Sequence, residues 1–248
     1  MEARLAHPVF DSIRYWLERI GDQPSLELLN SFSEERNLRT ESGRPVRFVA
    51  PSRSDPYYEI QLFETGQVQT RPENWHDLFN ALAWLAFPRT KARINCMHAA
   101  EIPREGGKRG RLRDMLTIFD EGGAILECAE PELERMVRES RWHDLFWEHR
   151  ARLRAALRVK VLGHAVMEAA LAPYPGITCK VVFVAPSSDP DSQAADWLAS
   201  RGRTPRDLPP FPILGYPGWD ERNGRAEFYA DTRYFRPSAY GNAGKRVS

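Results

Sequence analysis

Residues 74–82, Asn-Trp-His-Asp-Leu-Phe-Asn-Ala-Leu, carry the clearest helical pattern in the chain. Asn74 is a residue type that caps helix N-termini, because its side chain accepts a hydrogen bond from a free backbone N–H. Apolar side chains then follow at the i, i+3, i+4 and i+7 spacing of one helix face: Trp75, Leu78, Phe79 and Leu82. The stretch therefore predicts an amphipathic helix packed on a core, and Pro88 is expected to end it.

The flanking sequence contains more helical patterns than strand patterns. Helical spacing and capping residues predict helices over residues 9–20, 26–36, 89–100, 111–122 and 189–199, and over most of 131–172 with breaks near Ser140 and Gly163. Alternating or β-rich runs predict strands over 46–50, 58–63, 124–128 and 177–184. Residues 64–66, Glu-Thr-Gly, predict a hairpin turn after the second of these strands, with a partner strand that ends near Thr70.

These elements predict a single α+β domain, mostly helical, with a small mixed or antiparallel sheet. We expect residues 45–237 to form this domain and residues 1–44 to be a helical extension packed on the body. Proline and glycine dominate between Arg203 and Gly218, so this part of the chain is expected to wrap a finished body rather than build a new core. Residues 238–248 are expected to be a flexible tail.

Composition narrows the class of protein. The chain of 248 residues has 35 Lys and Arg against 34 Asp and Glu, a net charge of +1, whereas nucleic-acid-binding proteins usually show a basic excess. No apolar window is long enough to span a bilayer, so no membrane association is expected. The cysteines Cys96, Cys128 and Cys179 are far apart and form no metal-binding spacing. We therefore expect a cytoplasmic protein with reduced thiols and without a structural zinc site.

Two histidines stand beside carboxylates at spacings that suit chemistry. His76 lies off the apolar face of the first predicted helix, and Asp77 sits where a carboxylate also stabilises a helix N-terminus. His164 and Glu168 are four residues apart in a segment that is apolar all round, so we expect a buried pair. That pair is consistent with half a metal site, an acid–base pair or a structural hydrogen bond.

An acidic stripe precedes Gly122. Asp114, Asp120 and Glu121 offer oxygen ligands on one predicted helix, of the kind that a hard divalent cation such as Mg²⁺ or Mn²⁺ prefers. A solvated helix face explains the same pattern. Any bound metal is expected to be a hard or borderline dication, because carboxylates and imidazoles are the donors that the sequence brings near one another.

Basic residues concentrate in two segments. Residues 104–113 carry five basic residues against Glu105, a local charge of +4, and their glycines favour an anion-binding loop before a helix N-terminus. A mobile solvated loop is the alternative. Residues 150–158 carry an Arg stripe with four-residue spacing, and Glu134 and Glu148 precede Arg138 and Arg152 at the spacing of intrahelical ion pairs.

The pentapeptide Trp-His-Asp-Leu-Phe occurs twice, at residues 75–79 and 142–146. Such an identity is consistent with a duplicated helix. The flanking residues do not repeat, so a repeat architecture is not expected.

The chain resembles the bacterial family known as domain of unknown function 3025. The resemblance spans roughly residues 45–237 and is carried by 74–81 (Asn-Trp-His-Asp-Leu-Phe-Asn-Ala), 87–91 (Phe-Pro-Arg-Thr-Lys), Asn95, Arg113-Asp114, 119–121 (Phe-Asp-Glu), Gly163-His164, Glu168, 214–219 (Leu-Gly-Tyr-Pro-Gly-Trp) and 235–237 (Phe-Arg-Pro). This family carries no assigned activity. The resemblance implies that these polar positions belong to a shared pattern.

Two functions remain open from the sequence. The first is a hydrolase or transferase for an anionic substrate, for instance a phosphorylated one, in which His76 or His164 moves protons with Asp77 and Glu168. The metal candidates would hold a divalent cation, and the substrate would be bound by Asn74, Arg89, Lys91, Asn95, Arg113 and Trp219. The second is a non-catalytic binding module for nucleic acid or a protein partner, which would use the 104–113 loop and the 150–158 stripe. Convergence of the polar residues in one pocket would favour the enzyme.

Overall fold

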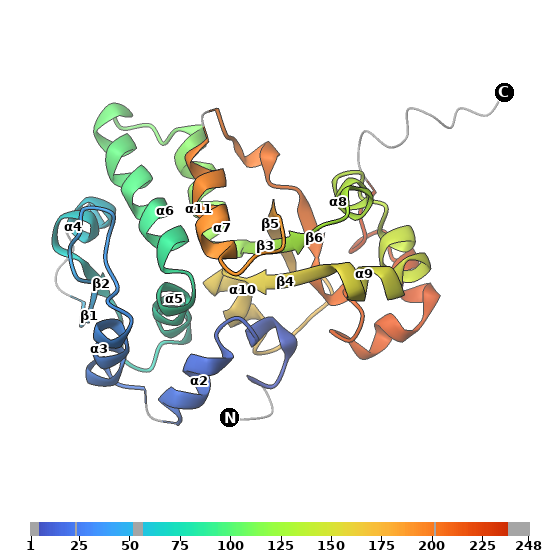
Figure 1. Cartoon of the computed structure of the whole chain (residues 1–248), viewed down its shortest axis with the longest axis horizontal. Coiled ribbons are helices and arrows are strands. Elements are labelled where there is room, and N and C mark those ends of the chain that lie inside the picture. Colours follow the sequence, from blue (N-terminus) through green and yellow to red (C-terminus); the bar gives the residue numbers. More distant parts are fainter. Residues whose placement is uncertain (1–4, 23, 52–56, 201, 238–248) are drawn as a thin grey trace.

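The computed structural model describes residues 5–22, 24–51, 57–200 and 202–237, so the expected flexible tail at 238–248 lies outside the described residues (Figure 1). Helices dominate, as the sequence predicts. The longer helices are α2 (Arg14–Ile20), α3 (Leu26–Glu35), α4 (Tyr58–Thr65), α5 (Trp75–Ala86), α6 (Pro88–Glu101), α7 (Arg111–Gly122), α8 (Pro131–Arg138), α9 (Arg150–Ala156), α10 (His164–Ala169) and α11 (Pro190–Ala199). Within the described ranges no helix is long and apolar enough to cross a membrane.

A mixed four-stranded sheet lies at the centre of the molecule. Its order is β4 (Leu157–Val161), β3 (Gly123–Cys128), β5 (Thr178–Val184) and β6 (Pro210–Pro212). Strands β3 and β5 are parallel, with Ile125 opposite Val182, and the two outer pairs are antiparallel. The predicted fold class, mostly helical α+β with a small mixed sheet, is confirmed.

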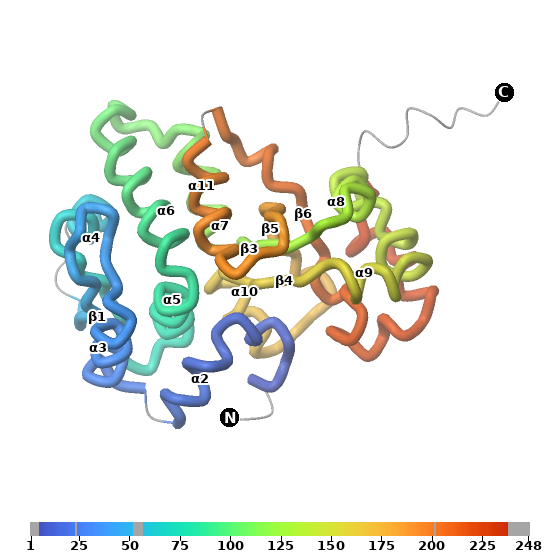
Figure 2. The backbone as a smooth tube through the Cα atoms, viewed as in Figure 1, coloured from blue at the N-terminus to red at the C-terminus, as the bar shows by residue number. Residues whose placement is uncertain are grey.

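The two faces of this sheet are buried in different cores, because side chains alternate along each strand. Ile125 and Val182 pack with Phe119 of α7 and Leu198 of α11. Leu126 and Val181 point the other way, into a larger core that also includes the N-terminal helices and α5. The tube view shows α7 and α11 together beside the sheet (Figure 2).

A second sheet of two short strands lies among the N-terminal helices. Strand β1 (Arg47–Val49) pairs with β2 (Gln67–Gln69) in parallel, not as a hairpin. The hairpin prediction for 58–70 is wrong, because residues 58–65 form helix α4 against α6. Tyr58 and Leu62 are four residues apart, and this spacing places two side chains on the same face of either a helix or a strand. The short alternation therefore fits both structures, and packing against α6 decides between them.

The prediction of helix throughout 131–172 is wrong at β4. Its breaks are confirmed, since Ser140 has a positive φ of 56° and Gly163 precedes α10. Between α9 and α10 the chain pairs with β3 as an outer strand, with Ala124 opposite Val161. Strand β4 is only five residues long and exposes Arg158, so its sequence shows little besides the β-branched Val159 and Val161 to distinguish it from a helix end.

The C-terminal segment does more than wrap the body. Strand β6 completes the sheet, and the following turns bury Tyr229 and Phe235 against Phe146, with Tyr234 packed on Phe235. The hydroxyl of Tyr234 donates to the carbonyl of Ile177, at 2.7 Å. The proline-rich composition signalled the lack of long elements, but it did not reveal that the segment carries part of the core.

Candidate metal centre

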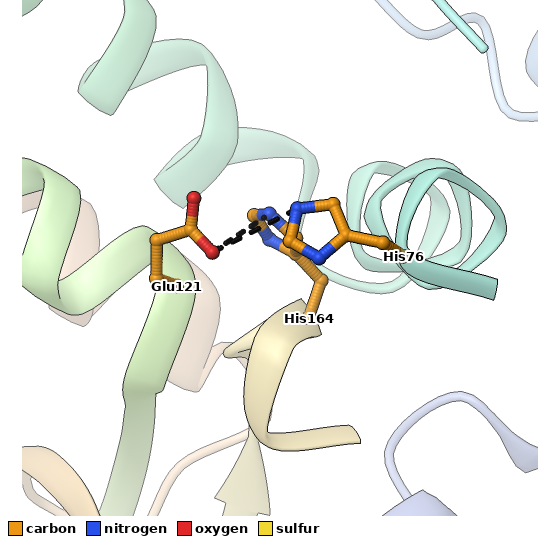
Figure 3. Close-up of side chains that lie close together, drawn as sticks. All are labelled: His76, Glu121 and His164. Carbon is orange, nitrogen blue, oxygen red and sulfur yellow. Dashed lines mark ion pairs between the residues drawn. The ribbon is translucent and has the colours of Figure 1, made fainter. Parts of the chain in front are cut away.

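His76 is the second residue of α5, and the helix start fixes its direction. The Asn74 side chain accepts a hydrogen bond from the backbone N–H of Asp77, at 3.0 Å, so the predicted cap is confirmed. Leu78 and Phe79 are buried. His76 lies beside this apolar face, and its ring reaches toward α7 and α10 (Figure 3).

Glu121 and His164 reach the same place from the junction of α7, β3 and β4. Helix α7 runs directly into β3, so Glu121 is two residues from the start of that strand. The backbone N–H of Gly163 donates to the carbonyl of Gly123, at 2.8 Å, and a Cβ atom on Gly163 would lie 2.6 Å from the nitrogen of Gly123. Only glycine permits this approach, which places His164 opposite the end of α7.

The three side chains converge on one point. Oε2 of Glu121 lies 3.5 Å from Nε2 of His164 and 3.8 Å from Nε2 of His76. The two rings are 4.5 Å apart between centroids and nearly perpendicular, at 79°. One ligand atom from each residue lies within 4.8 Å of the other two (Figure 3). Ligands at about 2.1 Å from one metal ion are separated by about 3–4 Å, so the cluster needs only a small contraction to hold a cation.

Glu168 orients one of the two imidazoles. Nδ1 of His76 lies 2.9 Å from Oε2 of Glu168. A proton on Nδ1 would be donated to this carboxylate, which leaves the Nε2 lone pair directed at the cluster. The predicted local pair of His164 with Glu168 is not formed, because Glu168 is half-exposed and bonds to α5 instead.

His164 is held neutral by its surroundings. It is 4% exposed, and burial, reinforced by the charge of Lys91, lowers its pKa to about 4, although Asp120 acts in the opposite sense. Its Nδ1 makes no hydrogen bond of ordinary geometry with the described residues. Burial raises the pKa of the Glu121 carboxyl, which the neighbouring His76 partly offsets. A neutral imidazole beside a half-buried carboxylate is the state that a metal ion requires of its ligands.

A buried ion pair holds the end of α7. Lys91 is 3% exposed, and its ammonium bonds to the carboxylate of Asp120 and donates to Oδ1 of Asn80, at 2.7 Å. Burial by itself would raise the pKa of Asp120, but the charge of Lys91 holds it below its usual range. Because Asp120 directly precedes Glu121, this pair fixes the backbone that carries the proposed ligand.

The polar network continues between α4, α6 and α7. Nδ2 of Asn95 donates to the carboxylate of Glu59, at 2.7 Å, and burial raises the pKa of that carboxyl. His98 lies further along α6, and its Nδ1 accepts a hydrogen bond at 3.2 Å from Arg113 of α7, which also pairs with Glu105 at 2.8 Å. Burial lowers the pKa of His98 to about 4. Asn95 and Arg113 therefore form hydrogen bonds and ion pairs inside the protein and do not belong to the cluster.

Sequence reasoning missed three members of this network, namely Glu59, Asn80 and His98. Glu59 lies in residues 58–63, for which the sequence predicts a strand with this side chain facing solvent. Asn80 is one helical turn after His76, and His98 is two turns after Lys91, so helical spacing was the signal that could have found both.

Other predicted site residues lie apart from the cluster. Asn74 is used as a cap, and Asp77 bonds through both carboxylate oxygens to Arg71, at 2.8 Å. The guanidinium of Arg89 faces Asp189, at 3.8 Å. The carbonyl of Trp219 accepts a hydrogen bond from His7, at 2.7 Å, so this residue anchors the N-terminal segment.

The predicted acidic metal set is separated by the fold. Asp114 forms an ion pair with Arg109, at 3.1 Å, and Asp120 is occupied by Lys91. Glu121 alone joins the cluster, with two imidazoles rather than two carboxylates. Asp114 and Glu121 share a face of α7 but are two turns apart, about 10 Å along the axis, and Asp120 is turned about 100° away from Glu121.

Within the described part of the chain, the 104–113 loop is partly neutralised by its neighbours, whereas the 150–158 stripe is not. In the 104–113 loop, Glu105 accepts from the N–H of Gly110 at 2.6 Å and from Arg113, while Arg104 pairs with Glu101 at 2.9 Å. In the 150–158 stripe, Arg158 donates to the carbonyl of Arg154 at 2.8 Å and Arg150 to that of Asn223 at 3.2 Å, and among the described residues neither pairs with a carboxylate. The predicted pair of Glu134 with Arg138 is confirmed, at 2.7 Å. Arg152 pairs with Glu130, and not with Glu148 as predicted.

Fold and site together define a mostly helical α+β protein with a half-exposed cluster of two histidines and one carboxylate, the donor set of open metal centres. The chain belongs to the family described as a protein of unknown function (DUF3025), whose family model matches residues 46–239. The resemblance drawn from the sequence motifs is thereby confirmed. No curated protein and no solved structure matches the chain.

Proposed function

We propose that this chain is a metal-dependent hydrolase whose divalent cation is bound by His76, Glu121 and His164. The observation that carries the proposal is the convergence of three ligand atoms from three separate helices within 4.8 Å of one another. Two imidazoles and one carboxylate suit Zn²⁺, Mn²⁺ or Fe²⁺. They suit Mg²⁺ less well, because Mg²⁺ prefers oxygen ligands.

The accessibility of the cluster supports catalysis more than a structural role. Structural zinc sites are closed by four protein ligands, whereas catalytic sites use three and leave a position for water or substrate. Here the side chains of His76 and Glu121 are 31% and 44% exposed, while His164 forms the buried wall. A bound cation would lower the pKa of a water molecule and polarise a carbonyl or phosphoryl oxygen.

The surrounding residues would hold the metal ligands in place rather than contact the metal ion. Glu168 would hold the His76 ring with Nε2 toward the cation, and the pair of Lys91 with Asp120 would hold the end of α7. Both contacts come from elements other than the one that carries the ligand, so they fix the ligand directions before any substrate binds.

The substrate class, the type of acceptor and the location of the protein have less support than the metal site. An anionic substrate stays a prediction, because Arg89, Lys91 and Arg113 each face a carboxylate partner already. Group transfer to an acceptor other than water, a cytoplasmic location and the alternative of a binding module also stay predictions. Three of the five basic residues in the 104–113 loop pair with carboxylates, so this loop offers a binding partner less free charge than its composition suggests.

Metal analysis of the purified chain tests the proposal. The protein is stripped with a chelator, reloaded with Zn²⁺, Mn²⁺ or Mg²⁺, and assayed for bound metal by elemental analysis and calorimetry. We expect one Zn²⁺ or Mn²⁺ ion per chain, and loss of this binding in Glu121→Ala. The Asp114→Ala variant is the matched control on the same helix and should bind normally. Failure of both ions to bind, or equal binding by the two variants, would overturn the proposed site.

Hydrolysis is tested with p-nitrophenyl acetate and p-nitrophenyl phosphate, which separate carboxylic from phosphoric esters. The reloaded wild type is expected to turn over at least one of them, and the stripped protein and Glu121→Ala neither. Stoichiometric metal without turnover of either ester would contradict the hydrolase and leave a metal-binding protein.

A further inference from the structure

A cavity of about 510 Å³ lies between α2, α3 and the start of α5. Its walls are mainly apolar, and the side chains that matter here are Leu17, Ile20, Leu26, Leu29, Trp75 and Leu78. Sites for small organic molecules are mostly apolar hollows of about 300–1,000 Å³ with a few polar groups at the edge. The cavity falls within that range. Exposed residues also line it, so the cavity opens to solvent and a ligand can enter.

The cavity and the candidate metal centre share the first turn of α5. Trp75 lines it, and the next residue in the chain is His76, so the first turn of α5 presents one face to each. Arg71 lies on the same wall and holds Asp77 through two hydrogen bonds of 2.8 Å. The cavity wall formed by Trp75 is therefore one residue from the proposed ligand His76, which does not itself line the cavity.

The loop between cavity and metal centre is strained. Glu73 has a φ of 55°, in the left-handed region that non-glycine residues rarely adopt, and it lines the cavity directly before the Asn74 cap. Such a conformation costs on the order of 1 kcal/mol or more and is characteristic of binding and active sites. The strain lies in a residue of the cavity wall, three residues before His76 in the chain.

The charges at the edge of the cavity indicate what it would exclude. Asp22, Glu27 and Glu73 are exposed and line it, against Arg71 as the one cation among the described lining residues. Arg71 is already paired with Asp77. An anionic ligand would meet a net negative edge and an apolar interior, and both are unfavourable to it.

We propose that this cavity binds an uncharged apolar group, an acyl chain or an aromatic ring, carried by the substrate of the neighbouring metal centre. The binding of the apolar group stands on the cavity alone, whereas its identity as part of the substrate rests on the proposed hydrolase. Cleavage would then occur at a polar bond just outside the cavity, where His76 and Glu121 are exposed.

Binding is tested on the chelator-stripped protein, so that the metal plays no part. The probe is N-phenyl-1-naphthylamine, an uncharged fluorophore, compared with 1-anilinonaphthalene-8-sulfonate, which has the same rings and a negative charge. We expect the neutral probe to bind about tenfold more tightly, with a difference that shrinks at high salt. Tighter binding of the sulfonate, or no binding of the neutral probe, would overturn the proposal.

Leu26→Trp locates the probe. The larger side chain fills the cavity and should weaken binding of the neutral probe at least tenfold, with Leu26→Phe intermediate. Leu28→Trp is the matched control, since Leu28 is on the same helix, half-buried, and outside the cavity lining. Melting temperatures check that each variant is folded. Equal binding by Leu26→Trp, Leu26→Phe and Leu28→Trp would place the probe elsewhere and contradict the assignment.

The link to the substrate has its own measurement. With metal restored, p-nitrophenyl decanoate should be cleaved with a kcat/KM at least tenfold above that of the acetate, and Leu26→Trp should abolish this preference while Leu28→Trp keeps it. Probe binding without a chain-length preference would refute the link to the substrate and leave the cavity site intact. Absence of turnover on both esters would instead count against the hydrolase.

Discussion

The pentapeptide Trp-His-Asp-Leu-Phe occupies two places in this protein, and the two copies share their packing but not their chemistry. Trp75 stacks on Phe79 at 5.5 Å and Trp142 stacks on Phe146 at 5.8 Å, one turn apart in each case. Both copies bury the Leu and the Phe. The short sequence thus sets which side chains enter the core in both settings.

The histidines of the two copies have different neighbours. His76 faces His164 at 4.5 Å between ring centroids and bonds to Glu168. His143 is 48% exposed and faces Glu148 at 3.7 Å, five residues along its own chain segment. A local sequence determines burial, whereas a cluster with ligating geometry requires side chains from other elements.

The ends of the two copies also differ. The first starts a regular helix behind the Asn74 cap, while the second follows Arg141 and enters a π-helical turn over Asp144–Glu148. Arg141 pairs with Asp144, at 2.7 Å, so the second aspartate is held within its own turn. The pentapeptide identity therefore does not extend to a duplicated structural unit.

The largest expected difference between the two copies is in metal binding. His76→Ala should abolish stoichiometric binding of Zn²⁺ or Mn²⁺, because it removes one of three proposed ligands. His143→Ala should bind as the wild type does. Calorimetry on stripped protein measures both variants. Normal binding by His76→Ala would end the distinction between the copies and remove His76 from the site.

A buried histidine should make stability depend on pH in a way that exposed His143 does not. The folded pKa of His98 is about 4, below its unfolded value of about 6.5, so its stabilising contribution is complete above pH 6.5 and is lost as the pH falls toward 4. Between pH 7 and pH 4, the free energy of unfolding of the chelator-stripped wild type should fall by up to about 3 kcal/mol more than that of His98→Gln. Urea unfolding at several pH values measures this, with His143→Gln as control. Parallel curves for all three proteins would show that His98 does not titrate as its burial indicates.

The partners of His76 extend the comparison to stability. His164→Ala should lower the free energy of unfolding by about 2 kcal/mol in metal-free protein, because it empties a buried position. His76→Ala should cost about 1 kcal/mol or less, and His143→Ala less than about 0.5 kcal/mol, since both are more exposed. Denaturant unfolding gives the three values. A larger loss of unfolding free energy in His76→Ala than in His164→Ala would mean that His76 contributes more to packing than its exposure indicates.

The smallest predicted effect separates the two carboxylate partners. Glu168→Gln keeps a hydrogen bond to Nδ1 of His76 but removes the charge, and it should weaken metal binding about tenfold. Glu148→Gln, the corresponding change beside His143, should leave metal binding unchanged. Competition against a chelator of known affinity resolves a tenfold difference. Equal affinities would show that Glu168 does not orient the ligand.

Much of the fold follows from local sequence. The Asn74 cap, Pro88 at the start of α6, the glycines after α7 and the β-rich run of β5 all fix their elements through backbone geometry and apolar spacing. Strand β4 and helix α4 could not be predicted, because they span only five and eight residues. Segments this short carry too few side chains to specify a period, so pairing with β3 and packing on α6 decide them.

The sequence by itself identified His76, Glu121, His164 and Glu168 as residues capable of chemistry, but only the tertiary structure decided their grouping. Helical spacing suggested His164 with Glu168, and Glu121 with Asp114 and Asp120. The fold instead brings His76 to Glu168, and Glu121 to both histidines. The reason is that spacing along one helix determines only which residues share a face. The close backbone crossing of Gly123 and Gly163 determines which faces meet.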